Sequence, residues 1–311
     1  MSTEIKRVAV IGAGVIGASW TALFLAKGLD VVVTDVAADG ETRLQAFLDG
    51  VWPALEAAGL SAGASRDRVI FTADLAEAIA GCDLVQENGP ERLEFKRELY
   101  AKLDSLLPAG VIIASSSSGL TMSAIQTACA RHPERCLIAH PFNPPHLIPL
   151  VELVGGAKTA ETTVARAEAF YRALGKKTIR LHKEVPGHVA NRLQAALFRE
   201  IVHLIAEDVV SVADADTAVT WGPGLRWGVM GPSLLYHLGG GQGGIEHFFE
   251  QFSGPMSAWW AVLGDPSLTP DIKAKIIKGV GQEAEGRSID QLAAYRDHIL
   301  SGLLALRAEE R

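Results

Sequence analysis

Residues 8–17 read VAVIGAGVIG, an apolar run followed at once by three regularly spaced glycines. The run from Val8 to Ile11 is typical of a strand buried in a parallel sheet. Gly12, Gly14 and Gly17 follow it in the spacing G-x-G-x-x-G. The first glycine permits a tight turn, the second lets a pyrophosphate approach the backbone, and the third lets the next helix pack closely on the sheet. The spacing predicts a dinucleotide-binding turn, with a glycine-rich turn of another α/β fold as the alternative.

The residues after this turn complete the pattern of a dinucleotide-binding βαβ unit. A stretch over 20–27 predicts a helix, whose N-terminus offers free amide groups and a positive dipole to phosphates. A second strand over 31–35 ends at Asp35, where a carboxylate accepts hydrogen bonds from ribose hydroxyls. No arginine is near Asp35 to compensate a 2′-phosphate, so NAD is expected rather than NADP. The expected cofactor residues are Gly12, Gly14, Val15, Ile16, Gly17 and Asp35.

Composition and charge exclude several classes of partner. The chain has 311 residues and a net charge of −7, so we expect no nucleic-acid partner. Residues 8–26 are uncharged, but the glycines and the strand that follows disfavour a membrane span or a signal peptide. The cysteines at 82, 129 and 136 have no metal or disulfide spacing, and no histidine cluster suits zinc. The sequence predicts a cytoplasmic protein with no metal site and no membrane partner.

Strand and helix patterns alternate through the first part of the chain. Apolar runs predict further strands over 69–71, 84–87, 111–114, 136–139, 150–154 and 177–181, with helical patterns over 37–58, 74–80, 94–106 and 162–174. This alternation predicts an α/β fold with a Rossmann-type, doubly wound, mostly parallel sheet. From Pro186 onward the patterns are helical only, with a glycine-rich break at 239–244. We therefore expect an NAD-binding domain over 1–185 and an all-α C-terminal domain over 186–311.

Polar side chains lie at or near the expected strand ends, where ligands of a doubly wound sheet bind. Oxidation of an alcohol needs a base that works near neutral pH, which suits His140, and a carboxylate that orients the base. Glu152 lies on an otherwise apolar strand, where a carboxylate needs a partner. Ser118 and Asn191 offer neutral donors to a developing oxyanion. Taken singly, His140 is equally typical of a loop histidine, and Glu152 of an ion-paired structural glutamate. Ser118 is equally typical of a polar turn, and Asn191 of the start of a helix.

Together these residues resemble the L-3-hydroxyacyl-CoA dehydrogenase superfamily over nearly the whole chain. The resemblance is carried by GAGVIG at 12–17, HPFNP at 140–144, PGHVANR at 186–192, and the residues Glu91, Lys96, Ser115–Ser118 and Glu152. It implies that His140 is the catalytic base, that Glu152 pairs with it, and that a serine and Asn191 contact the substrate. Ser118 fits the family position best, with Ser116 as its neighbour. The resemblance also implies that residues matching Glu91, Lys96 and Asn143 hold the nicotinamide end of NAD, and we place Ser116 with them.

The helical part of the chain bears on the choice of substrate. GPGLRWGVMG at 222–231 and HFFEQF at 247–252 are similar to the branch of the superfamily that oxidises L-carnitine. NPP at 143–145 and PLVELV at 149–154 are shared with the branch that oxidises L-gulonate. A trimethylammonium group is bound well by aromatic faces. Candidate substrate contacts are therefore Trp221, Trp227 and Phe252, with Arg226 for the carboxylate; a helical core or dimer contact is the alternative for these residues.

The sequence thus predicts an NAD-dependent enzyme that oxidises the 3-hydroxyl of a short 3-hydroxy acid. L-carnitine is the first expectation, with L-gulonate or a 3-hydroxyacyl-CoA ester as alternative substrates. A non-catalytic NAD-binding protein of the structural or sensor type is the alternative from another class. The resemblance further implies a homodimer formed through the C-terminal domain.

Overall fold

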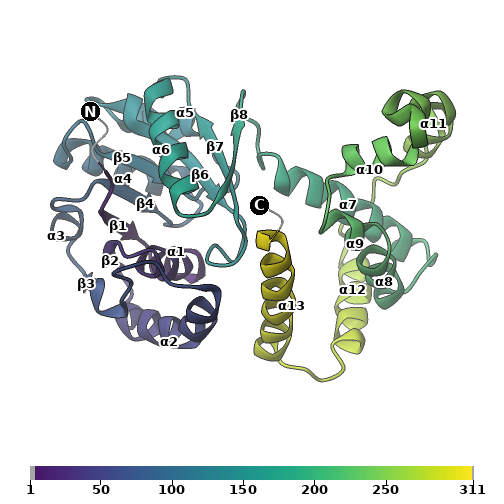
Figure 1. The fold of residues 1–311 in the computed structure, drawn as a ribbon, viewed down its shortest axis with the longest axis horizontal. Helices are drawn as coiled ribbons and strands as arrows, with labels where there is room; N and C mark the ends of the chain where they lie inside the picture. Colours follow the sequence, from purple (N-terminus) through teal and green to yellow (C-terminus); the bar gives the residue numbers. More distant parts are fainter. Residues whose placement is uncertain (1–3, 310–311) are drawn as a thin grey trace. The chain divides into compact units, whose positions relative to one another are not determined.

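The computed structural model describes residues 4–309 and contains one sheet in its N-terminal part (Figure 1). The strands are β1 (Arg7–Ile11), β2 (Asp30–Thr34), β3 (Val69–Thr72), β4 (Leu84–Glu87), β5 (Ile112–Ser115), β6 (Cys136–Pro141), β7 (Leu150–Gly155) and β8 (Lys177–Leu181). Their order across the sheet is β3-β2-β1-β4-β5-β6-β7-β8. All neighbours are parallel except β6 and β7, which run antiparallel. The α/β fold with a doubly wound, mostly parallel sheet is therefore confirmed.

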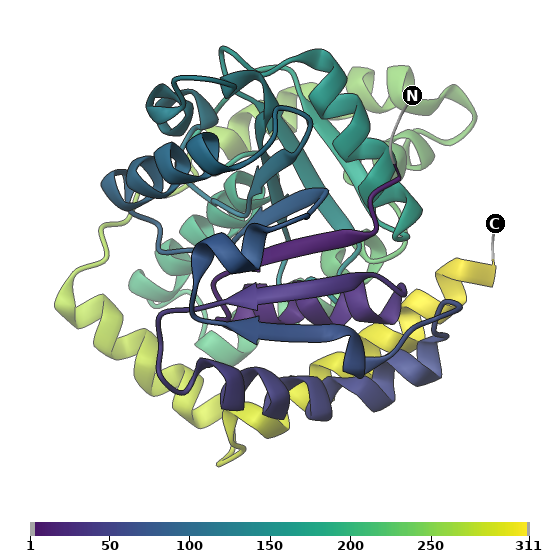
Figure 2. The same ribbon diagram turned by 90° about the vertical axis from the view of Figure 1, so that its left-hand side faces the viewer.

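Helices connect these strands and cover both faces of the sheet (Figure 2). They are α1 (Val15–Ala26), α2 (Gly40–Ala58), α3 (Leu75–Ile79), α4 (Leu93–Leu106), α5 (Met122–Ile125) and α6 (Glu161–Ala173). Short 3-10 turns lie at Arg66–Arg68, Gln126–Ala128 and Pro133–Arg135. The strand order reverses between β1 and β4, and a doubly wound sheet binds its ligand at such a point.

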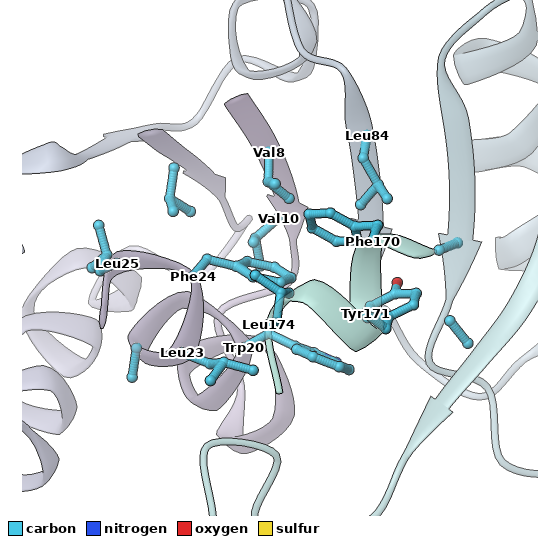
Figure 3. Close-up of a cluster of buried hydrophobic side chains, with 14 of the residues drawn as sticks. Val8, Val10, Trp20, Leu23, Phe24, Leu25, Leu84, Phe170, Tyr171 and Leu174 are labelled. Atoms are coloured by element: carbon cyan, nitrogen blue, oxygen red, sulfur yellow. The ribbon is translucent and has the colours of Figure 1, made fainter. Parts of the chain in front are cut away.

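Alternate residues of each strand face opposite layers, which divides the core in two. One layer packs α1, α2 and α6 on Val8, Val10 and Leu84, and the rings of Trp20 and Tyr171 meet there at 5.5 Å (Figure 3). The other layer packs α3, α4 and α5 on the intervening residues of the same strands. These apolar layers fix the carboxyl ends of the strands, where the polar residues lie.

The chain divides between Asn191 and Arg192 into two compact units. Helix α7 (Ala190–Ala206) thus begins in the first unit, a few residues beyond the expected boundary at 185. The backbone amides of Val189 and Ala190 bind a carboxylate of the sheet, which ties the start of α7 to the first unit.

The second unit is helical throughout the part that the structure describes. Beyond α7 it contains α8 (Val212–Trp221), α9 (Pro223–Trp227), α10 (Pro232–Gly239), a 3-10 turn (Gly241–Gly243), α11 (Gly244–Trp260), α12 (Pro270–Glu283) and α13 (Ile289–Glu309). The glycine-rich break falls between α10 and α11, where a Cβ on residue 240 would lie 1.7 Å from the carbonyl oxygen of Gly244. Over residues 4–309, no helix has both the length and the apolar character needed to span a bilayer.

Candidate active site

The glycine-rich turn between β1 and α1 has the geometry that its spacing predicts. Gly12 has φ of 88°, and a Cβ there would lie 2.8 Å from the carbonyl oxygen of Asn88. A Cβ on Gly17 would lie 1.8 Å from the carbonyl oxygen of Gly12, so only glycine lets α1 approach the strand end. Around Gly14 a Cβ would meet nothing within 4 Å, which leaves the backbone open to a ligand.

A cavity of about 530 Å³ opens beside this turn, within the first unit. Gly12 and Gly14 line one part of it, and Asp35 and Val36 line another. No side chain of the described residues caps the N-terminus of α1, so its first amide groups are available to phosphate oxygens. Asp35 accepts hydrogen bonds from the amides of Ala13, at 2.6 Å, and Ala37, at 2.9 Å. The turn, the free helix end and the carboxylate fit an NAD molecule, and Val15 and Ile16 form the first turn of α1.

His140 and Glu152 lie directly opposite each other on the antiparallel strands β6 and β7. Nδ1 of His140 lies 2.8 Å from Oε2 of Glu152, and both side chains are buried. Nε2 of His140 lies 3.1 Å from the hydroxyl of Ser118. Since a carboxylate only accepts, Nδ1 carries the proton, and the unprotonated Nε2 accepts the hydrogen bond from the hydroxyl of Ser118. The imidazole is therefore set to accept a proton at Nε2.

The second oxygen of Glu152 is held by the start of α7. Oε1 accepts from the amides of Val189, at 2.9 Å, and Ala190, at 3.0 Å. Burial alone would raise the pKa of Glu152, but the hydrogen bonds from His140 and these two amides outweigh burial and hold the pKa below its ordinary value. The carboxylate thus stays charged beside the imidazole, where it stabilises an imidazolium.

The four serines after β5 have different partners. Ser115 donates to Oε2 of Glu87 at 2.6 Å, and Ser117 donates to Oε1 of Glu91 at 2.7 Å. Ser116 donates to Oδ1 of Asn88 at 2.7 Å and accepts from Trp20 and Gln86. Ser118 alone among the four contacts His140, and it is exposed. Among the four serines, Ser118 is therefore the one whose hydroxyl lies beside His140.

The expected cofactor residue Lys96 is buried in an ion pair, and the expected cofactor residue Glu91 lies at the exposed edge of the same group of charges. Nζ of Lys96 binds both oxygens of Glu87, at 2.8 and 2.9 Å, and lies 3.8 Å from Glu91. Glu91 also accepts from the amides of Gly119 and Leu120, so it shapes the loop that carries Ser118. Sequence reasoning missed Glu87, although a carboxylate at the end of an apolar strand is the same signal that singled out Glu152.

The remaining expected residues are distributed over both units. Asn143 is exposed in the loop after β6, and Asn191 is half-buried in the first turn of α7. Arg226 and Trp227 end α9, Trp221 ends α8, and Phe252 stacks on Phe248 within α11. Over residues 4–309 there is no group of three or more His, Cys, Asp or Glu side chains that could hold a metal ion.

The sequence matches two family models along almost its whole length. Residues 7–185 match the NAD-binding domain of 3-hydroxyacyl-CoA dehydrogenase, and residues 187–295 match the C-terminal domain of the same enzyme. The chain belongs to the 3-hydroxyacyl-CoA dehydrogenase family. As a member of this family it is an NAD-dependent dehydrogenase, and its reaction is the oxidation of a 3-hydroxy acid.

Several curated relatives of this 3-hydroxyacyl-CoA dehydrogenase family member are named L-carnitine dehydrogenase. The Streptomyces coelicolor protein is 47% identical over 94% of this chain and 92% of its own length. The Bacillus cereus protein is 45% identical over 97% of this chain and 93% of its own length. The Pseudomonas aeruginosa protein is 43% identical over 99% of this chain and 96% of its own length.

Two solved structures share the fold of this family member. One is described as 5-formyl-3-hydroxy-2-methylpyridine 4-carboxylic acid 5-dehydrogenase, an NAD⁺-dependent dismutase, with 32% identity and a TM-score of 0.82 over 98% of both chains. The other is 3-hydroxybutyryl-CoA dehydrogenase from Escherichia coli, with 29% identity and a TM-score of 0.68 over 89% of this chain and 57% of the other.

Proposed function

We propose that the protein oxidises L-carnitine to 3-dehydrocarnitine with NAD⁺ and that His140 is the base. The observation that carries the residue assignment is the hydrogen-bond chain Ser118–His140–Glu152, which makes Nε2 of His140 a hydrogen-bond acceptor facing the hydroxyl of Ser118. The choice of L-carnitine is supported by the relatives of that name, which cover nearly the whole chain. The alternative of a non-catalytic NAD-binding protein is set aside, because the family model is that of a dehydrogenase and the curated relatives are named as dehydrogenases.

The proposed roles follow from the order of the hydrogen bonds. The hydroxyl of Ser118 orients the substrate 3-hydroxyl toward Nε2 of His140, which takes the hydroxyl proton. Glu152 keeps the proton on Nδ1 beforehand and stabilises the imidazolium afterwards. When bound, NAD⁺ supplies the hydride acceptor. Loss of the hydroxyl proton, together with loss of a hydride from the carbon that bears the hydroxyl group, turns the alcohol into a ketone.

The remaining site residues are proposed in supporting roles. Gly12, Gly14, Gly17 and Asp35 hold the adenosine and pyrophosphate parts of NAD, while Glu91, Lys96, Ser116 and Asn143 order the nicotinamide end. Asn191 donates to the substrate. Exposed aromatic side chains of the second unit, among them Trp221 and Trp227, offer faces to a trimethylammonium group, and Arg226 offers a partner to its carboxylate.

A substrate panel tests the choice of L-carnitine. L-carnitine, L-gulonate and L-3-hydroxybutyryl-CoA are each supplied with NAD⁺, and NADH formation is followed by absorbance. A binding site strongly rejects a substrate whose charged or polar groups find no partner in it. We therefore expect kcat/KM for L-carnitine to exceed that for the other two substrates by at least about tenfold. A higher kcat/KM with L-gulonate or with the acyl-CoA ester would overturn the choice while leaving the residue roles intact.

We also propose that two copies of the chain associate through the second unit. Only five apolar side chains of its described residues are buried: Val202, Ile205, Val212, Ala215 and Phe248. Large apolar side chains on α11 are exposed instead, including Phe249, Trp259 and Trp260. An exposed apolar surface of this kind is most commonly covered by a second copy of the same chain. Sedimentation equilibrium should give twice the chain mass of 33.1 kDa, and a monomer at micromolar concentration would refute the proposal.

The proposed cellular location follows from the cysteines. Cys82, Cys129 and Cys136 are free and buried in the structure. The sulfur atoms of Cys129 and Cys136 lie 3.7 Å apart without a disulfide bond. Thiols that remain free at this distance suit a reducing compartment, so we place the protein in the cytoplasm. Immunoblotting of cytoplasmic and periplasmic fractions tests this location, and recovery in the periplasmic fraction would contradict it.

A further inference from the structure

His188 lies in the turn between β8 and α7 and is 2% exposed. Its backbone has φ of 50°, a left-handed conformation that is uncommon for a residue other than glycine. The backbone amide of His188 closes the turn by donating to the carbonyl of Val185 at 3.0 Å. A buried imidazole held in a strained backbone conformation needs contacts that stabilise it.

Two contacts hold the ring of His188. Nε2 lies 3.0 Å from the carbonyl oxygen of Ser117, so Nε2 carries a proton and donates it. The ring centroid lies 5.1 Å from that of His140, with the two planes tilted by 50°. Nδ1 is buried and has no hydrogen-bond partner among the described residues.

These contacts place His188 between both ends of the catalytic hydrogen-bond chain. Ser117, whose carbonyl it binds, directly precedes Ser118, whose hydroxyl reaches Nε2 of His140. The two residues that follow His188 are Val189 and Ala190, whose amides bind Oε1 of Glu152. The left-handed turn at His188 thus lets one short segment bind the serine loop with its side chain and the glutamate with its backbone.

We propose that His188 is a positioning residue for the reaction, an inference that rests on the proposed role of His140. Its ring packs beside the imidazole of His140, and its Nε2–H group anchors the loop that carries Ser118 by donating to the carbonyl of Ser117.

Two variants of His188 and one control separate the role of its ring from the role of its hydrogen bond. His188→Phe keeps a ring beside His140 but removes the donor to Ser117. His188→Gln removes the ring but keeps a donor at the position of Nε2. His182→Phe is the matched control, since His182 lies six positions earlier in the same connection and is exposed. If His188→Phe does not fold, His188→Asn takes its place, because asparagine tolerates the left-handed backbone and is too short to reach Ser117.

The first readout is independent of the substrate. In the free protein, the Nδ1 proton of His140 is observed by NMR of ¹⁵N-histidine-labelled protein and assigned by its loss in His140→Gln. We expect His188→Phe to broaden or shift this signal, while His188→Gln and His182→Phe leave it in place. An unchanged signal in His188→Phe, or the same loss in the phenylalanine and glutamine variants, would overturn the proposal.

The second readout is kinetic and uses the best substrate of the panel. We expect His188→Phe to lower kcat by about tenfold and to change KM by less than about threefold, because it disturbs alignment rather than binding. His188→Gln should retain kcat within about threefold of the wild type. Equal kcat values for the wild type, His188→Phe and His188→Gln would overturn the positioning role. If no substrate of the panel is turned over, the proposed function fails, and the NMR readout still decides the question of His188.

Discussion

Replacing His140 with Gln is expected to lower kcat by about 10³-fold and to leave the Kd for NADH within about twofold of the wild-type value. Glutamine has a similar size but no electron pair basic enough to take the proton of an alcohol. The expected loss corresponds to about 4 kcal/mol in the barrier of the chemical step. NADH binding should persist, because His140 does not line the cavity beside the glycine-rich turn.

Steady-state kinetics with the best substrate and a fluorescence titration with NADH measure these two quantities. His182→Gln is the matched control, because this histidine is exposed and distant in sequence from β6. A kcat for His140→Gln within tenfold of the wild type would remove His140 from the reaction. Loss of NADH binding would instead mean that the substitution disturbs the cofactor site.

Replacing Glu152 with Gln is expected to lower kcat by about 10²-fold or more, since the imidazolium loses its counter-charge and the tautomer of His140 is no longer fixed. The same substitution should reduce the free energy of unfolding at neutral pH by about 2 kcal/mol. Both oxygens of Glu152 accept from N–H donors. An amide NH₂ group at either position would face a donor, which leaves buried polar groups unsatisfied.

The stability difference should depend on pH with a defined sign. The pKa of Glu152 in the folded state is held below its ordinary value of 4.5, so the unfolded chain takes up a proton first as the pH falls. The stabilisation by the charged carboxylate is present above pH 4.5 and is lost as the pH falls through the folded pKa. Urea unfolding should therefore show that the difference in the free energy of unfolding between the wild type and Glu152→Gln becomes smaller as the pH is lowered from neutral to acidic. A constant difference over this range would contradict the assigned charge state.

The local features of the fold were predictable from the sequence because they depend on neighbouring residues. The apolar run before Gly12 and the spacing to Gly17 predict the first strand, the turn and the helix, and the structure contains all three. Asp35 was expected to end the second strand and lies directly after β2. These features follow from backbone sterics within some thirty residues, so no tertiary contact was needed to infer them.

Features that depend on pairing between distant segments were not predictable in detail. The sequence indicated strands at 136–139 and 150–154 but not their antiparallel pairing, which sets His140 opposite Glu152. Likewise, four consecutive serines look alike in the sequence, and only the family resemblance favoured Ser118; the contact between its hydroxyl and His140 depends on the loop held by Glu91. The contribution of the 188–190 segment was also missed, since a left-handed histidine has no sequence signature.

The claim on which the whole account depends is that the substrate hydroxyl meets Nε2 of His140. A crystal structure of the protein with NADH and L-carnitine, a pair that does not react, measures this contact directly. The account predicts the 3-hydroxyl oxygen within about 3.2 Å of Nε2, with Ser118 bonded to the same oxygen. A carnitine bound with its hydroxyl directed away from His140, toward another acid–base group, would contradict it.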